Sequence, residues 1–272
     1  MLNRRSRRLR AMPVNSLIPN IFTIMALCAG MSAIRFALQG KWELAVAAVL
    51  VAGILDGLDG RLARMLKGAT KFGAELDSLS DFIAFGVAPA LVIYLWSTEG
   101  LGGIGWISGL AYSTCCALRL ARFNTALDDP DKPAWASNFF TGVAAPAGAG
   151  LALLPMGISF QFEISVLREP VFMAVWLIVV GLLMVSRIPT YSFKRVRVRR
   201  ELVLPTLLVV GLGAAMLANY PWFVVSLLGL LYLVSIPFSY RSHRRLSEGA
   251  AVQTPEAETD DEPEEDVEKT GE

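Results

Sequence analysis

Four aspartates stand at spacings that could gather divalent metal ions. Asp56 and Asp59 are three residues apart, and Asp77 and Asp81 are four apart. Residues at these spacings share one face of a helix, so each pair would point in one direction. Two facing helices could then bring all four carboxylates into one small volume, where cations would offset their repulsion. Carboxylate oxygens suit Mg²⁺ or Mn²⁺, and a pair of such ions is suited to displacement at phosphorus.

The residues around these aspartates fit a ligand that carries phosphate. Gly60, Ala63 and Gly73 lack bulk, so the backbone can approach a ligand or a neighbouring helix closely. Arg64 offers a planar fork of donors for phosphate. The alternative is a solvated loop in which the aspartates pair with nearby cations, namely Arg61, Arg64, Lys67 and Lys71. We favour the metal site, because four ionisable groups in apolar segments are usually functional.

The composition places these aspartates in a membrane protein. Hydrophobic residues make up 54% of the chain and charged residues 18%, and the mean hydropathy is +0.50. A hydrocarbon core about 30 Å thick needs roughly 20 apolar residues in a helix, which marks eight candidate spans. They are residues 15–38, 42–66, 74–97, 103–122, 139–158, 170–187, 201–218 and 221–239. The sequence therefore predicts an all-α fold, a polytopic membrane helical bundle.

The basic residues predict the orientation of this bundle. Twenty-two of the 25 Lys and Arg residues fall on the side that would hold both termini and the four aspartates. Arg35, Lys41 and Arg168 fall on the other side. Because cytoplasmic loops collect positive charge, we expect a multi-pass protein of the cell inner membrane whose termini and active site are cytoplasmic. The acidic stretch 247–272 is expected to be a disordered tail.

The aspartates belong to a longer pattern. The spacing D-x2-D-G-x2-A-R-x8-G-x3-D-x3-D, from Asp56 to Asp81, resembles the complete signature of the CDP-alcohol phosphatidyltransferase family. The resemblance implies a six-helix catalytic core, a CDP-linked lipid donor, two Mg²⁺ or Mn²⁺ ions, release of CMP and a homodimer. It divides the chain into a basic N-terminus (1–14), the core (15–200), two additional transmembrane helices (201–240) and the tail (247–272).

The resemblance also implies a role for particular residues. By position, Asp56, Asp59 and Asp77 resemble metal ligands, and Asp81 resembles a metal ligand that also serves as the general base. The residues that would contact the nucleotide and diphosphate of the donor are Asn20, Thr23, Gly60, Arg64 and Thr70.

The acceptor alcohol has to be inferred from other parts of the chain. Residues 118–124, 140–146 and 184–194 are similar to integral-membrane bacterial phosphatidylserine synthases. This likeness implies transfer of a phosphatidyl group from CDP-diacylglycerol to L-serine, a step of phospholipid biosynthesis. Glycerol 3-phosphate or an inositol phosphate is the alternative acceptor. An ion-coupled transporter is a different class of function, but it would show inverted repeats, and the second half of the chain has few acidic residues within its spans.

Serine itself sets requirements for the site. Its carboxylate and ammonium groups would need a cation and a hydrogen-bond acceptor near the metal cluster. The candidates on the cytoplasmic side are Arg119, Arg122, Asn124, Arg187 and Lys194, and the sequence favours Arg122 and Arg187 because they lie closest to the ends of spans. The alternative for the basic ones is the general enrichment of Lys and Arg in cytoplasmic loops.

Overall fold

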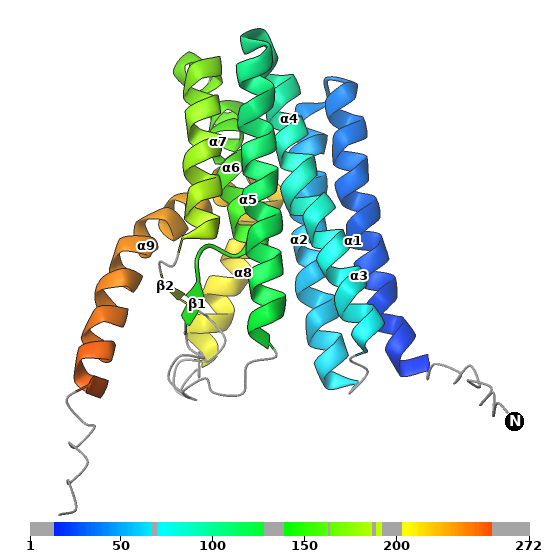
Figure 1. Ribbon diagram of the computed structural model, residues 1–272, viewed down its shortest axis with the longest axis vertical. Helices are drawn as coiled ribbons and strands as arrows, with labels where there is room; N and C mark the ends of the chain where they lie inside the picture. The colour runs from blue at the N-terminus through cyan, green and yellow to red at the C-terminus, as the bar shows by residue number, and fades with distance from the viewer. Residues whose placement is uncertain are drawn as a thin grey trace, which may run out of the picture.

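The computed structural model describes residues 14–66, 70–127, 139–162, 164–186, 189–191 and 203–251. These residues form a bundle of long helices, from which α9 slants away (Figure 1). The longer helices are α1 (Val14–Leu38), α2 (Trp42–Met65), α5 (Gly103–Leu127), α6 (Ala145–Gln161), α7 (Pro170–Val185), α8 (Val203–Asn219) and α9 (Pro221–Ala251). Between α2 and α5 the chain forms α3 (Lys71–Asp81), a π-helical stretch (Phe82–Val87) and α4 (Ala88–Trp96). The predicted all-α class is confirmed, apart from one short pair of strands.

The strands correct the predicted start of the fifth span. Residues 139–141 form β1 (Phe139–Thr141), which pairs antiparallel with β2 (Pro189–Tyr191) and does not begin a helix. The helix starts only at Ala145, after a turn in which Gly142 has a φ of +77°. A Cβ atom at Gly142 would lie 2.5 Å from the carbonyl oxygen of Met184, so this turn requires glycine.

The bundle presents many apolar side chains outward. Helices Leu17–Leu38 and Lys71–Trp96 are long and apolar enough to cross a membrane, and the shorter apolar helices of the described residues are Pro170–Val185, Pro205–Asn219 and Pro221–Ile236. On α8, Leu208 is 72% exposed, and its neighbours Leu207 and Val209 are exposed as well. Soluble proteins rarely expose such continuous apolar surface, so these helices support a membrane protein. The number of spans stays a prediction.

Small residues let the helices around the aspartates pack closely. Helix α1 packs along α2 and also contacts α3 and α4. A Cβ atom at Gly30 of α1 would lie 2.7 Å from the Cα atom of Ala84, which shows how near the two backbones are. Ala33 of α1 and Ala45 and Ala52 of α2 are fully buried as well. In an apolar bundle this close packing of backbones is the main source of helix association.

A π-helical stretch directly after Asp81 was not predicted from the sequence, which indicated one regular helix over 74–97. The stretch Phe82–Val87 is held by hydroxyl groups of α5. The Tyr112 hydroxyl donates to the carbonyl oxygen of Phe85 at 2.9 Å, and Ser113 Oγ donates to that of Gly86 at 3.1 Å. Such interruptions of a helix often lie at functional sites. Here the interruption fixes how the end of α3, with Asp81, faces α5.

Candidate active site

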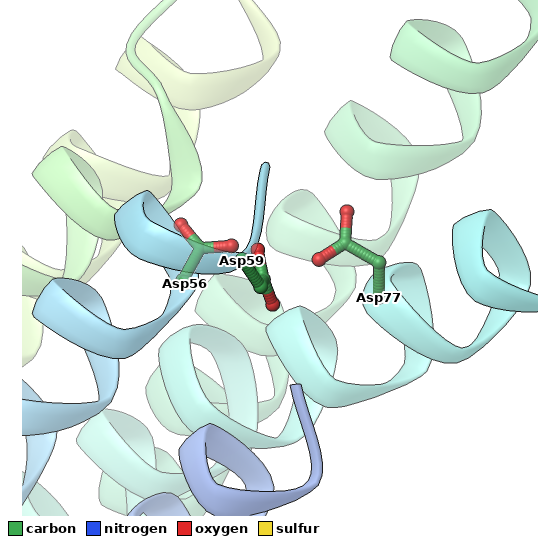
Figure 2. Close-up of side chains that lie close together, drawn as sticks. All are labelled: Asp56, Asp59 and Asp77. Atoms are coloured by element: carbon green, nitrogen blue, oxygen red, sulfur yellow. The ribbon is translucent and has the colours of Figure 1, made fainter. Parts of the chain in front are cut away.

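Three of the predicted aspartates, two from the second half of α2 and one from α3, lie close together. Figure 2 shows Asp56 and Asp77 pointing toward each other, with Asp59 between them. One carboxylate oxygen from each lies within 4.8 Å of the others. In an octahedral Mg²⁺ site with bonds of about 2.1 Å, neighbouring ligands are about 3.0 Å apart and opposite ligands about 4.2 Å. The three carboxylates would therefore draw closer together to hold one ion, and a donor set of carboxylate oxygens suits a hard divalent cation.

Asp81 joins this cluster through Asp56. Its side chain lies one helical turn beyond Asp77 and forms a hydrogen bond with the carboxyl group of Asp56. Two carboxyl oxygens at hydrogen-bonding distance need a shared proton or a nearby cation, because two negative charges would otherwise repel. The four predicted aspartates are thus brought together, with Asp56 in contact with both the three-carboxylate group and Asp81.

Helix α1 contributes a hydroxyl group that orients Asp59. Thr23 Oγ1 donates to Asp59 Oδ2 at 2.7 Å, and it also lies 3.2 Å from the carbonyl oxygen of Pro19. Asp59 is only 4% exposed, and Thr23 is buried beside it. One turn away from Asp77, Ser80 Oγ donates to the Thr23 carbonyl oxygen at 3.1 Å, which ties α3 to α1. A buried hydroxyl that donates to a metal ligand holds that ligand in one orientation.

The other predicted donor-binding residues lie at the start of α3, on α1 and in the last two turns of α2. Thr70 caps this helix, because its Oγ1 accepts a hydrogen bond from the Gly73 N–H at 3.0 Å. A Cβ atom at Gly73 would lie 2.9 Å from Asn20 Oδ1, so only glycine lets α1 come this near. A Cβ atom at Gly60 would meet only Arg64 Nη1, at 3.8 Å. The Gly60 side of the cluster is therefore open, with the exposed guanidinium of Arg64 beside it.

The candidate acceptor residues lie in different surroundings. Arg119 is buried on α5, and its Nε donates to the carbonyl oxygen of Val143. Arg122 is exposed, and its Nη1 donates to the Val185 carbonyl oxygen at 2.8 Å. Asn124 Nδ2 donates to Ser78 Oγ on α3 at 2.9 Å. Arg187 and Lys194 lie outside the described residues, as does Lys67.

Several supporting residues were missed by the sequence analysis. Tyr112 and Ser113 hold the π-helical stretch, and Ser80 joins α3 to α1. Each is a hydroxyl group on a helix, and its residue type alone does not identify the partner of its hydrogen bond.

Comparison with known proteins shows the family of the chain. The family described as CDP-alcohol phosphatidyltransferase matches residues 16–190, and the one described as CDP-alcohol phosphatidyltransferase 2 matches residues 201–237. A curated CDP-diacylglycerol–serine O-phosphatidyltransferase of Mycobacterium tuberculosis is 38% identical over 236 residues, which cover 87% of this chain and 82% of the relative. The proteins of that name from Helicobacter pylori and Bacillus subtilis are 36% and 32% identical, over 74% and 65% of this chain and 84% and 92% of their own lengths.

Proposed function

Because the chain belongs to the CDP-alcohol phosphatidyltransferase family, we propose that it transfers the phosphatidyl group of CDP-diacylglycerol to the hydroxyl of L-serine and releases CMP. The observation that carries this proposal is the meeting of Asp56, Asp59 and Asp77 in one cluster that Asp81 joins. Relatives named for the same reaction match this chain over most of its length. The enzyme is thus a phospholipid-synthesising transferase.

The reaction is a displacement at the phosphorus that carries the lipid. The serine hydroxyl oxygen forms a bond to this phosphorus, and the bond to the bridging oxygen of CMP breaks. CMP leaves with that oxygen, and the hydroxyl proton of serine has to be accepted. Asp81 is the carboxylate that we assign as the base, because it lies on the α3 stripe that carries Asp77 and contacts Asp56.

The aspartates also provide the ligands for two divalent ions. Asp56, Asp59 and Asp77 would hold the first ion, and Asp81 together with Asp56 would hold the second. Bound Mg²⁺ or Mn²⁺ would neutralise the diphosphate and stabilise the negative charge on the departing CMP. Thr23 keeps the Asp59 carboxylate in position for this task.

The donor would enter on the open side beside Gly60. Arg64 would bind the diphosphate with its planar fork, and Asn20 and Thr70 would line the nucleotide at the start of α3. Asp56 and Asp59 lie in the second half of α2, toward the end of the bundle where α1 begins and α2 ends (Figure 1). That position lets the polar cytidine group stay in water while the acyl chains of the donor remain in the bilayer.

The wider setting of the enzyme follows from the same proposal. The catalytic core would comprise 15–200 and the additional helices 201–240, with the site on the cytoplasmic side of the inner membrane and two copies forming a homodimer. Helix α9 includes residues 247–251 of the predicted acidic tail, and the rest of the tail lies outside the described residues.

A panel of acceptors tests this function. Purified protein in detergent should release CMP from CDP-diacylglycerol when L-serine and Mg²⁺ or Mn²⁺ are both present. Omission of serine or excess chelator should abolish release. Full turnover in chelator would contradict the metal requirement, and productive turnover with glycerol 3-phosphate in place of serine would contradict the acceptor.

A further inference from the structure

Arg119 is a buried cation beside the aspartate cluster. It projects from α5, only 9% exposed, and its Nε donates to the carbonyl oxygen of Val143, just before α6. A buried charge is costly unless opposite charge lies close to it. The groups with an electrostatic effect on this guanidinium are Cys116, Asp81, Tyr232 and Asp56. Two contacts place α5 along the segment that carries Asp81: a Cβ atom at Gly86 would lie 3.2 Å from the Cβ atom of Cys116, and Asn124 donates to Ser78 at 2.9 Å. Arg119 lies between Cys116 and Asn124 on α5, as Asp81 lies between Ser78 and Gly86, so Arg119 lies near the assigned base.

The other basic residues at this end of the bundle lie in different positions. Arg64 is exposed at the end of α2, beside Gly60 on the side we assign to the donor. Arg122 lies one turn beyond Arg119 but is exposed and donates to the Val185 carbonyl oxygen. Among the described candidates for an acceptor-binding cation, Arg119 is the buried one, and its charge acts on Asp56 of the aspartate cluster.

We infer that Arg119 binds the carboxylate of the acceptor amino acid beside Asp81 and thereby selects an acceptor that carries a carboxylate. This inference rests on the proposed function. In serine, two carbon atoms separate the hydroxyl oxygen from the carboxyl carbon. A site that holds the hydroxyl at Asp81 therefore brings the carboxylate to a cation next to Asp81.

The bond to Val143 prepares the arginine for this role. It fixes the plane of the guanidinium, so little side-chain freedom is lost when an anion binds. The two Nη groups of the guanidinium can then donate hydrogen bonds to both oxygens of a carboxylate.

The surroundings of Arg119 differ from those of the donor residues. Asn20, Gly60 and Thr70 lie on or beside α1, α2 and α3, whereas Arg119 lies on α5, Val143 precedes α6 and Tyr232 lies on α9. Helix α9 packs on α6, where the rings of Trp222 and Phe160 meet edge to face at 4.9 Å. The additional C-terminal helices thus bring a phenol group near the acceptor side of the site.

Two acceptors that differ only in the carboxylate test the inference. L-serine and serinol (2-amino-1,3-propanediol) share a hydroxyl and an ammonium group, but serinol has a hydroxymethyl group in place of the carboxylate. Wild-type enzyme should prefer serine. Arg119→Gln should lower kcat/KM for serine by about 10- to 100-fold, mainly through KM, because a charge-assisted pair is lost. Its kcat/KM for serinol should fall by much less, because serinol never made that pair and loses only the effect of Arg119 on the aspartate cluster.

Two further variants complete the test. Arg119→Lys keeps the charge but loses the planar fork, so its loss for serine should be intermediate and again larger than its loss for serinol. Arg35→Gln removes an exposed arginine 12 residues beyond Thr23 on α1, about 18 Å along that helix, and should leave both acceptors unchanged. The ratio of the two acceptors is measured within one preparation, so a smaller folded fraction does not alter it.

The outcomes separate this inference from the proposed function. Equal losses for serine and serinol in the Arg119 variants would overturn the inference and show that Arg119 acts through Asp81 or through packing. A wild-type enzyme that does not distinguish the two acceptors would overturn it as well. Turnover of wild-type enzyme with glycerol 3-phosphate and none with serine would overturn the proposed acceptor, and the assignment of Arg119 with it.

Discussion

Replacing Thr23 with valine removes one hydroxyl group and keeps the shape of the side chain. The hydroxyl donates to Asp59 Oδ2 at 2.7 Å, and both residues are buried. Without this donor, Asp59 can turn away from the position in which it meets Asp56 and Asp77. Loss of a partner that orients a metal ligand typically weakens metal binding by about 10- to 100-fold. We expect the Mn²⁺ concentration for half-maximal CMP release to rise by that factor.

The assay is a Mn²⁺ titration of CMP release, supported by direct measurement of Mn²⁺ binding. Saturating metal should restore most of the turnover of Thr23→Val, and Thr23→Ser should behave like wild type because it keeps the donor. Ser32→Ala is the matched control, since Ser32 Oγ, on the same helix, bonds the carbonyl oxygen of Cys28 at 2.7 Å. An unchanged metal requirement with weaker binding of CDP-diacylglycerol would refute this reasoning and indicate that Thr23 contacts the donor directly.

Three further predictions concern the aspartates and their supports. Asp81→Asn should lower single-turnover CMP release by at least about 100-fold with little change in donor binding, whereas Asp56→Asn should weaken metal-dependent donor binding; near-normal turnover of Asp81→Asn would contradict the assignment of the base. Tyr112→Phe leaves the Phe85 carbonyl oxygen without its side-chain donor and should lower the free energy of unfolding by about 1–3 kcal/mol. An unchanged Tm would contradict this. Gly73→Ala places a Cβ atom 2.9 Å from Asn20 Oδ1 and should reduce activity, whereas Gly57→Ala, whose Cβ atom meets nothing within 4 Å, should not; equal effects would count against the close approach of α1.

The sequence predicted the aspartate cluster because its geometry is local. Spacings of three and four residues place Asp56 with Asp59, and Asp77 with Asp81, whatever the rest of the chain does. Helical periodicity and apolar length likewise predicted where the long helices lie, with errors mainly at their ends. The start of α6 was wrong because Gly142 turns the chain before Ala145, and pairing with residues 189–191 holds 139–141 as a strand.

Other features depend on partners far away in the sequence. The π-helical stretch after Asp81 is held by Tyr112, 27 residues from Phe85, and Asp59 is oriented by Thr23, 36 residues away. Nothing in an apolar run such as Phe82–Val87 distinguishes it from a regular helix. The sequence favoured Arg122 over Arg119 as the acceptor-binding cation, because Arg122 lies closer to the end of a predicted span. Only the fold buries one of them beside Asp81 and leaves the other exposed.

The transfer of an oxygen atom tests the central claim most directly. L-serine labelled with ¹⁸O in its hydroxyl group would be incubated with the enzyme, CDP-diacylglycerol and Mn²⁺, and both products analysed by mass spectrometry. Our account predicts that the serine oxygen attacks the phosphorus, so each lipid product retains one ¹⁸O and the released CMP contains none. CMP that carries ¹⁸O, or a lipid product without it, would contradict the proposed displacement.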